Sequence, residues 1–231
     1  MSARYAVYFS PAQDSLLWQL GCAWLGRDAA NDAALAQPHI DGISSERLHA
    51  LTMSPRRYGL HATLKPPFRL AAGVTHDMLI AATRALASRM QPFTLPTLGV
   101  DVLSGFIALR TAQEGEALRR LADACVAELD RYRLPADAEE VARRRSHGLS
   151  AAQDALLARF GYPYVLSEWR FHITLTERLS GSERELLLAW LARHFAPALA
   201  IPIRCDDICL FVQERCDTHF TLHSRFALGA R

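Results

Sequence analysis

The chain has 231 residues, 50% of them hydrophobic, and a formal net charge of +2. It is long enough to bury a sizeable core, but it carries too little charge to indicate non-specific nucleic-acid binding. No apolar run reaches the roughly 18 residues of a membrane span, and the N-terminus lacks the residue order of a secretion signal, so we expect a cytoplasmic protein. The five cysteines include no CxxC pair, which favours reduced thiols.

The N-terminal part of the chain is predicted to form a strand followed by two helices. Residues 5–9 (YAVYF) alternate and are rich in β-forming residues. Ser10 and Pro11 then stand where an N-cap and a first helical residue are expected, ahead of an apolar series at helical spacing: Leu16, Leu17, Leu20 and Trp24. After a loop near residues 37–42, a short helix is expected over about residues 44–53.

The middle of the chain, about residues 54–112, has the predicted order strand, helix, strand, strand, and we call it unit one. Its first strand lies within YGLHATLKPPF, and a helix follows from near Thr75 to Met90. Two β-rich segments come next, FTLPTLGVDVL and SGFIALRT. Ser104 and Gly105 between them are typical of a tight turn.

A helical insert with a polar middle, about residues 113–161, leads to unit two, about residues 162–231. Gly161 is expected to cap the last helix of the insert. Unit two repeats the order of unit one: WRFHITLTER is predicted to form a strand, SGSERELLLAWLARHF a capped helix, and IPIRCDDICLFVQE and THFTLHSRFAL two more strands. We therefore predict a single bilobed domain over residues 1–231.

Aligning the units places His61 and His172 at the same position, on the strand before the helix, and each begins a His-x-Thr-Leu tetrad. Chance predicts only about 0.4 His-x-Thr triplets in a chain of this composition. Side chains alternate along a strand, so each unit has one polar face, with these members: Gly59, His61, Thr63 and Lys65 in unit one, and Arg170, His172, Thr174 and Thr176 in unit two. A pseudo-twofold axis between the units would bring the two faces together across one cleft.

Two imidazoles, two hydroxyls and a cation in one cleft suit a phosphodiester substrate. Hydrolysis needs a base that takes a proton from water and an acid that protonates the leaving alkoxide, and histidine titrates near neutral pH. We expect His61 and His172 to fill these two roles, in an order that the sequence leaves open. The groups expected to bind the phosphate oxygens or offset their charge are Thr63, Thr174, Lys65 and Arg170.

The paired tetrads HATL and HITL resemble the two-histidine (2H) phosphoesterase superfamily, whose LigT-like members act on cyclic phosphates and RNA ends. The longer strings PRRYGLHATLKPPFRL and GYPYVLSEWRFHITLTE resemble one bacterial branch, the phosphonate-metabolism proteins. The resemblance implies a bilobed α+β fold, with two antiparallel sheets flanking a central cleft and helices outside. It also implies a phosphodiesterase without metal or other cofactor, in which the two histidines are acid and base and the two threonines bind phosphate. By analogy, the substrate is a cyclic phosphoribosyl phosphate.

Three further residues are candidates for substrate contact. Tyr58 has the opposite strand parity to the first histidine, so its contact would need a bulge. Arg144 lies in the run Arg143–Arg145, which is typical of a solvated helix face but would suit a clamp on an anionic substrate. Thr176 shares the polar face of unit two. His219 begins a third tetrad whose strand has no histidine counterpart in unit one, so we expect it to lie outside the catalytic pair.

Three other interpretations stay open. A structural zinc site is one, because cysteines and histidines gather in one region, although their spacing fits no zinc pattern: Cys205, Cys209, Cys216, His219 and His223. A non-catalytic nucleotide-binding module is another. The third is an enzyme for nucleoside 2′,3′-cyclic phosphates or RNA 2′-5′ linkages. RNA would require a basic track with exposed aromatic residues, so a small anionic phosphate ester is favoured. No obligate protein partner is evident.

Overall fold

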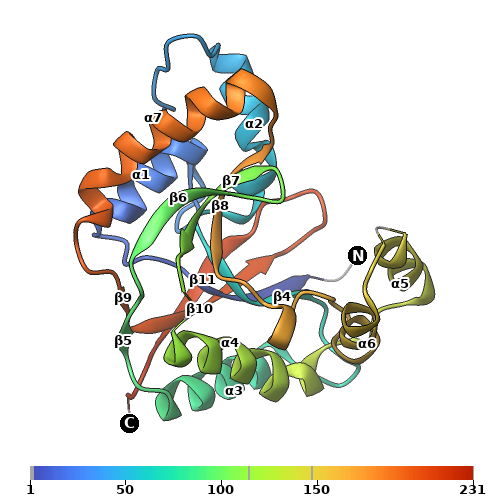
Figure 1. Ribbon diagram of the computed structural model, residues 1–231. Helices are drawn as coiled ribbons and strands as arrows, with labels where there is room; N and C mark the ends of the chain where they lie inside the picture. Colours follow the sequence, from blue (N-terminus) through green and yellow to red (C-terminus); the bar gives the residue numbers. More distant parts are fainter. Residues whose placement is uncertain (1–2, 114, 147, 231) are drawn as a thin grey trace.

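The structure, a computed structural model, describes residues 3–113, 115–146 and 148–230, and one antiparallel sheet crosses the middle of the molecule (Figure 1). The strands are β1 (Arg4–Phe9), β2 (Arg27–Asp28), β3 (Ala33–Ala34), β4 (Ala62–Phe68), β5 (Phe93–Thr94), β6 (Leu98–Leu103), β7 (Phe106–Thr111), β8 (His172–Arg178), β9 (Arg204–Cys205), β10 (Asp207–Gln213) and β11 (Thr221–Ala227). The helices are α1 (Leu16–Leu25), α2 (Ser45–Tyr58), α3 (His76–Arg89), α4 (Glu116–Glu128), α5 (Ala138–Arg145), α6 (Ala151–Phe160) and α7 (Gly181–Leu199), with 3-10 turns η1 (Asp130–Tyr132) and η2 (Leu166–Glu168).

Seven strands form one sheet in the order β11-β10-β1-β4-β8-β7-β6, while β2-β3 and β5-β9 form separate two-stranded sheets. The predicted α+β class is confirmed, but the two flanking sheets that the resemblance implies are here a single sheet. The reason is that β4 and β8 are hydrogen-bonded neighbours. Ala62 lies opposite Ile173, and this pair joins the two groups of strands.

The two sequence units are interleaved in this sheet. On one side of the β4-β8 junction, β4 of unit one continues into β1, β10 and β11, whereas β8 of unit two continues into β7 and β6. The helices also pack against strands of the other unit. Helix α3 of unit one packs against β10 and β11 of unit two, and α7 of unit two packs against β6 of unit one. The sequence predicts the element order of each unit, but it does not predict that each half of the sheet combines strands from both units.

Helix starts follow local capping. Helices α2 and α3 begin close to the predicted positions, and the side-chain oxygens of Ser44 and Thr75 cap them. The predicted start of the first helix is wrong, because Ser15 caps α1. Ser10 instead donates its hydroxyl to the Leu60 carbonyl oxygen at 2.6 Å. Ser10 directly follows β1, and Leu60 lies in the segment that leads into β4, so this hydroxyl links the two segments rather than capping a helix.

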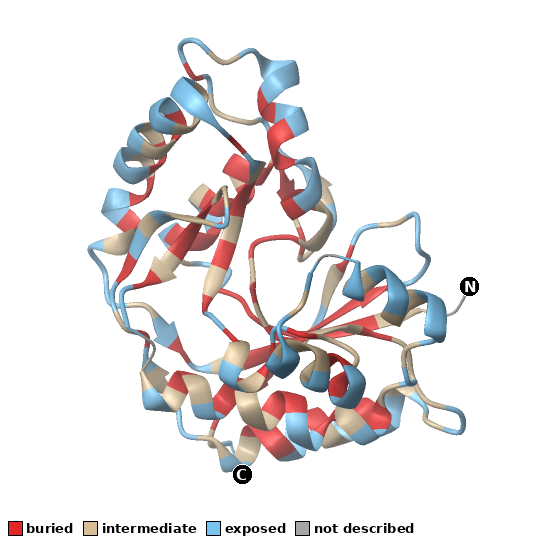
Figure 2. Cartoon of the chain, turned by 45° about the vertical axis from the view of Figure 1, so that its right-hand side comes forward, coloured by how far each residue is buried: buried red, intermediate tan, exposed pale blue. Residues whose placement is uncertain are grey.

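Buried side chains occupy both faces of the sheet, because residues alternate along each strand. Figure 2 shows the buried positions gathered on the strands and on the helix sides that face them. The larger cluster lies between sheet and helices and includes Val7, Leu64 and Ile173. A smaller cluster on the opposite face includes Tyr8 and Phe220. None of the helices in the described ranges is long and apolar enough to cross a membrane.

Candidate active site

The two His-x-Thr motifs meet at the junction of β4 and β8. These strands are antiparallel, and Ala62 pairs with Ile173, so the register sets each histidine beside the threonine of the other motif: His61 by Thr174, and Thr63 by His172. Ala62 and Ile173 point into the core. The four motif side chains on the other face are half-buried and line one pocket of about 970 Å³. The histidine and threonine of each predicted polar face are thus brought together on adjacent strands.

Each imidazole is anchored by a backbone carbonyl group two residues earlier. The Nδ1 atom of His61 lies 2.9 Å from the Gly59 carbonyl oxygen, and the Nδ1 atom of His172 lies 2.8 Å from that of Arg170. A carbonyl oxygen can only accept, so we assign the hydrogen of each neutral ring to Nδ1. Nε2 is then the nitrogen of each ring that can take up a proton.

Gly59 orients the first imidazole, and the site requires glycine there. Its φ of 78° lies in the left-handed region that favours glycine. A Cβ at this position would also lie 2.4 Å from the Cβ of Ala29, which is too close. Because the Gly59 carbonyl anchors His61, the tight turn between α2 and β4 determines where the imidazole points.

The environment of His61 favours its neutral form. Burial lowers the pKa of His61 from 6.5 to about 4. The hydrogen bond with the Gly59 carbonyl opposes this change, while the positive charge of a protonated His172 lowers the pKa further. At pH 7 the His61 ring is therefore neutral and can act as a proton acceptor.

Lys65 lines the same pocket, but its ammonium group already has partners. The side chain is 2% exposed, and Nζ donates to the Val126 carbonyl oxygen at 3.2 Å and to Asp130 Oδ1 at 3.4 Å. Burial lowers the pKa of Lys65 to about 8, although the Asp130 carboxylate opposes this change. The predicted phosphate-binding cation is thus present at the pocket and shared with a carboxylate.

Two other predicted residues are not brought into the pocket. Arg170 is exposed and precedes β8, so strand alternation does not orient it toward the two motifs. Thr176 is buried, and its Oγ1 accepts a hydrogen bond from the Ile107 amide at 3.0 Å. The register between β7 and β8 shifts next to this position, between Phe106 and Ala108, which accounts for a side chain bonded to the neighbouring backbone.

Tyr58 and Arg144 both line the pocket. Helix α2 extends five residues beyond the predicted end near Met53, and Tyr58 is its last residue. The Tyr58 ring lies 5.9 Å from the ring of His61. Arg144, on α5, donates to Glu140 at 2.8 Å and stands 4.8 Å above the ring of Tyr162. The helical insert therefore forms one wall of the pocket.

Sequence reasoning missed two pocket residues on β1, Arg4 and Tyr8. The ring centroid of Tyr8 is 3.9 Å from that of His61. The alternation in YAVYF indicates that Tyr8 and Arg4 share a face, but nothing local indicates that β1 is the neighbour of β4. That adjacency is a property of the tertiary structure.

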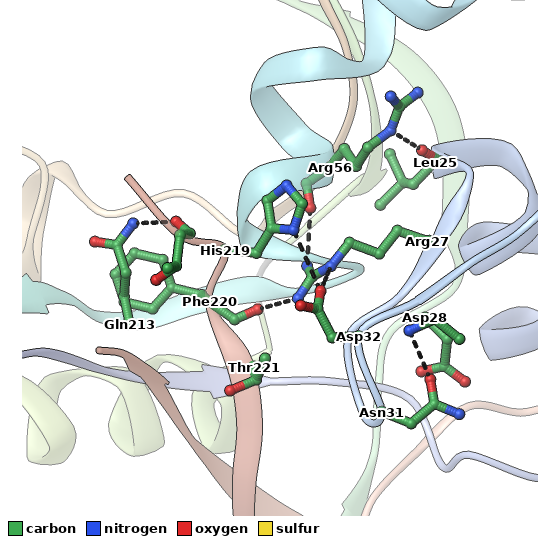
Figure 3. Close-up of polar contacts among 12 residues, drawn as sticks. Leu25, Arg27, Asp28, Asn31, Asp32, Arg56, Gln213, His219, Phe220 and Thr221 are labelled. Atoms are coloured by element: carbon green, nitrogen blue, oxygen red, sulfur yellow. Dashed lines mark hydrogen bonds and ion pairs between the residues drawn. The ribbon is translucent and has the colours of Figure 1, made fainter. Parts of the chain in front are cut away.

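The third tetrad lies outside the pocket. His219 Nδ1 is 3.2 Å from Asp32 Oδ1, which also accepts from Arg27 Nε at 2.5 Å (Figure 3). The buried Arg27 side chain donates to the Phe220 carbonyl oxygen at 2.7 Å as well. Phe220 is fully buried and stacks on Tyr58. The residue of this tetrad that approaches the pocket is therefore Phe220.

The cysteines do not gather around one point. Cys205 and Cys209 are buried and Cys216 is exposed. His223 lies edge-on to His76, with ring centroids 4.6 Å apart. Among the residues that the structure describes, no group of three or more His, Cys, Asp or Glu side chains is arranged to hold a metal ion.

The comparison with solved structures finds similar chains at low sequence identity and with TM-scores below 0.5. One is described as a phosphoesterase, with 16% identity and a TM-score of 0.46. Another is E. coli LigT complexed with 3′-AMP, with 16% identity and a TM-score of 0.45. Each match covers 100% of both chains.

Residues 63–221 match the family described as "Protein of unknown function (DUF1045)", and the chain belongs to this family. Two curated relatives carry the name "Ribose 1,5-bisphosphate phosphokinase PhnN". The protein of Janthinobacterium sp. (strain Marseille) is 39% identical over 215 residues, which are 91% of this chain and 48% of the relative. That of Laribacter hongkongensis (strain HLHK9) is 39% identical over 220 residues, 95% of this chain and 50% of the relative. The chain spans about half the length of the curated relatives it matches.

Proposed function

We propose that this protein is a phosphodiesterase in which His61 and His172 transfer protons during hydrolysis of a small phosphodiester. The observation that carries the proposal is the pairing of two His-x-Thr motifs on adjacent strands, with all four side chains lining one pocket. Both rings have Nδ1 anchored to a backbone carbonyl, so Nε2 of each is the atom that exchanges protons.

The mechanism assigns one proton transfer to each histidine. Neutral His61 accepts a proton from water as the water oxygen bonds to phosphorus, and protonated His172 gives a proton to the departing alkoxide as its bond to phosphorus breaks. We assign the base to His61 because burial keeps its pKa low. The products are a phosphate monoester and a free hydroxyl group, and the two histidines exchange roles in the reverse direction.

The two threonines and nearby cations stabilise the charge on phosphorus-bound oxygens in this proposal. Thr63 and Thr174 donate their hydroxyl hydrogens to the non-bridging oxygens. Lys65 contributes positive charge from the pocket wall, reduced by its ion pair with Asp130. None of these steps uses a metal ion.

We further propose that the substrate is a phosphorylated pentose, such as phosphoribosyl 1,2-cyclic phosphate. The name of the curated relatives contains a ribose bisphosphate. A pocket of about 970 Å³ is within the usual range for small molecules.

We do not extend the kinase reaction in the name of the curated relatives to this chain. The nucleotide-phosphate loop GxxxxGK[ST] does not occur here, because the only lysine, Lys65, follows Leu64. In our proposal the kinase reaction belongs to the half of the relatives that this chain does not match.

A second candidate is a nucleoside 2′,3′-cyclic phosphate or an RNA end. The aromatic side chains along the pocket favour it, because Tyr58 and Tyr162 offer rings on which a base could stack. A binding module that retains the pocket without turnover is the non-enzymatic alternative. The same experiment separates all three.

The test measures hydrolysis of phosphoribosyl 1,2-cyclic phosphate, nucleoside 2′,3′-cyclic phosphates and a 2′-5′-linked dinucleotide, with and without a chelator. We expect turnover of the pentose ester that chelation does not change. His61→Ala and His172→Ala should each lower kcat by about 100-fold or more. His219→Ala is the matched control and should retain activity, because His219 lies outside the pocket. Ligand binding without turnover on any compound would favour the binding module instead.

A further inference from the structure

Arg4 presents a positive charge to the pocket at a distance from the two histidines. Its Nε donates to Gln213 Oε1 at 2.7 Å, and its guanidinium stands 5.2 Å from the ring centroid of Phe220. Gln213 is itself buried and fixed, because its side-chain nitrogen donates to the Thr218 carbonyl oxygen at 2.6 Å. Figure 3 shows Gln213 beside Phe220. The guanidinium is therefore oriented by neutral groups, and it forms no ion pair with any carboxylate in the described part of the chain.

Tyr8 brings a hydroxyl group to the same region. The side chain is 0% exposed, and its hydroxyl oxygen has no hydrogen-bond partner among the described residues. Buried polar groups without partners are rare in folded proteins, because each loses its hydrogen bonds to water. Burial raises the pKa of Tyr8, and the nearby charge of Arg4 opposes this change. The hydroxyl thus keeps its hydrogen at neutral pH and lies within the influence of the Arg4 charge.

Both side chains come from the pocket face of β1, where residues four apart in sequence point the same way. Tyr8 lies directly opposite Thr63 in the pairing of β1 with β4, so it is one strand away from the proposed phosphate site. Neighbouring strands are about 4.8 Å apart. Two groups of one small molecule can therefore reach Thr63 and the Tyr8 side chain at the same time.

We propose that Arg4 and Tyr8 form a second anion subsite, which binds a phosphate monoester carried by the same small substrate whose phosphodiester lies at the histidine pair. This inference rests on the proposed function and narrows its substrate class to pentose phosphodiesters that bear a further phosphate group. A guanidinium and a hydroxyl are both donors, and a phosphate monoester offers them several charged acceptor oxygens. The name of the curated relatives contains a ribose bisphosphate, which agrees with such a ligand.

The experiment compares two substrates that differ only in the second phosphate: ribose 1,2-cyclic phosphate and its 5-phosphate derivative. The variants are Arg4→Met, which keeps the aliphatic stem over Phe220, and Tyr8→Phe, which removes only the hydroxyl. Tyr5→Phe and Arg84→Met are matched controls. Tyr5 lies on the same strand but in the core on the opposite face, and Arg84 stands over the ring of Phe226 outside the pocket.

We expect the wild-type protein to prefer the 5-phosphorylated substrate by about 10-fold or more in kcat/KM. Arg4→Met and Tyr8→Phe should each remove most of this preference, measured as the ratio of kcat/KM for the two substrates, and both controls should keep it. The melting temperature of Tyr8→Phe should be equal to or above that of the wild type, because the substitution removes an unpartnered buried hydroxyl.

Equal rates of the wild type on both substrates, or an unchanged preference in the two variants, would overturn the subsite and leave the phosphodiesterase proposal intact. A lower melting temperature of Tyr8→Phe would also overturn it, because the hydroxyl would then be structural. A calorimetric titration with ribose 5-phosphate decides the matter even if neither ester is hydrolysed. Weaker binding by both variants supports the subsite, and no binding by the wild-type protein refutes it.

Discussion

Ala62 and Ile173 face each other across the pairing that joins β4 to β8, and both side chains are buried in the core. Since each lies between the histidine and the threonine of its motif, this one contact brings the two motifs into register. The apolar residue in the middle of each His-x-Thr motif thus holds the two halves of the sheet together, through contacts on the face opposite the pocket.

The first prediction concerns the pH dependence of the reaction. We expect kcat/KM to rise as the pH increases through about 4, because His61 must lose its proton to act as the base, and to fall at higher pH as the acid loses its own. The apparent pKa values belong to the coupled pair. A pH-rate profile from pH 3.5 to 9 provides the measurement, and a flat profile would contradict two-histidine catalysis.

The same pKa shift links His61 to the stability of the fold. Its pKa is about 4 in the folded protein and near 6.5 in the unfolded chain, so between these values the unfolded chain binds more protons. This contribution to the free energy of unfolding is fully present above pH 6.5 and is lost as the pH falls toward 4. In urea unfolding, the wild type should lose more stability between pH 7 and pH 4.5 than His61→Gln does. Equal losses in the two proteins would show that burial does not shift this pKa.

Lys65→Met tests whether the buried ammonium group is structural. Asp130 keeps its ion pair with Arg133, at 2.8 Å, when the lysine is removed, and methionine has a similar volume. We therefore expect the free energy of unfolding to change by less than about 1.5 kcal/mol. If Lys65 also binds phosphate, KM should rise while the fold is retained. Denaturant unfolding and steady-state kinetics on one preparation measure both, and a large loss of stability would show that Lys65 is needed to hold Asp130.

Gly59→Ala tests the anchor of the first imidazole. The substitution should lower the free energy of unfolding by about 1–3 kcal/mol, because alanine at φ 78° is strained and its Cβ would meet Ala29. It should also lower kcat by displacing the carbonyl group that holds His61. Gly73→Ala is the matched control, since Gly73 has a similar φ of 77° but no atom within 4 Å of an added Cβ. Equal effects of the two substitutions on kcat would refute a special role for Gly59.

Much of the local structure follows from the sequence. Helices begin beside Ser44 and Thr75, as expected, and Gly161 adopts the left-handed conformation expected at a helix end. Ser104 and Gly105 both have positive φ, as a tight hairpin turn requires. Ser10 is the instructive exception. A serine followed by proline is typical of a helix start, but a carbonyl oxygen from residue 60 competes for its hydroxyl, and no local pattern reveals that competitor.

The residues of the candidate site can likewise be separated into those that the sequence predicts and those that it does not. Sequence pattern was sufficient to select His61, Thr63, His172 and Thr174, because strand alternation and a repeated motif act within a few residues. It could not select Arg4 and Tyr8, or exclude Arg170 and Thr176 from the pocket. Those outcomes depend on which strands are neighbours and on where a register shifts. The order of elements and the two histidine motifs can be predicted from local sequence patterns. The position of β4 between β1 and β8 is a property of the folded chain, because it comes from burial and hydrogen bonding between segments far apart in the sequence.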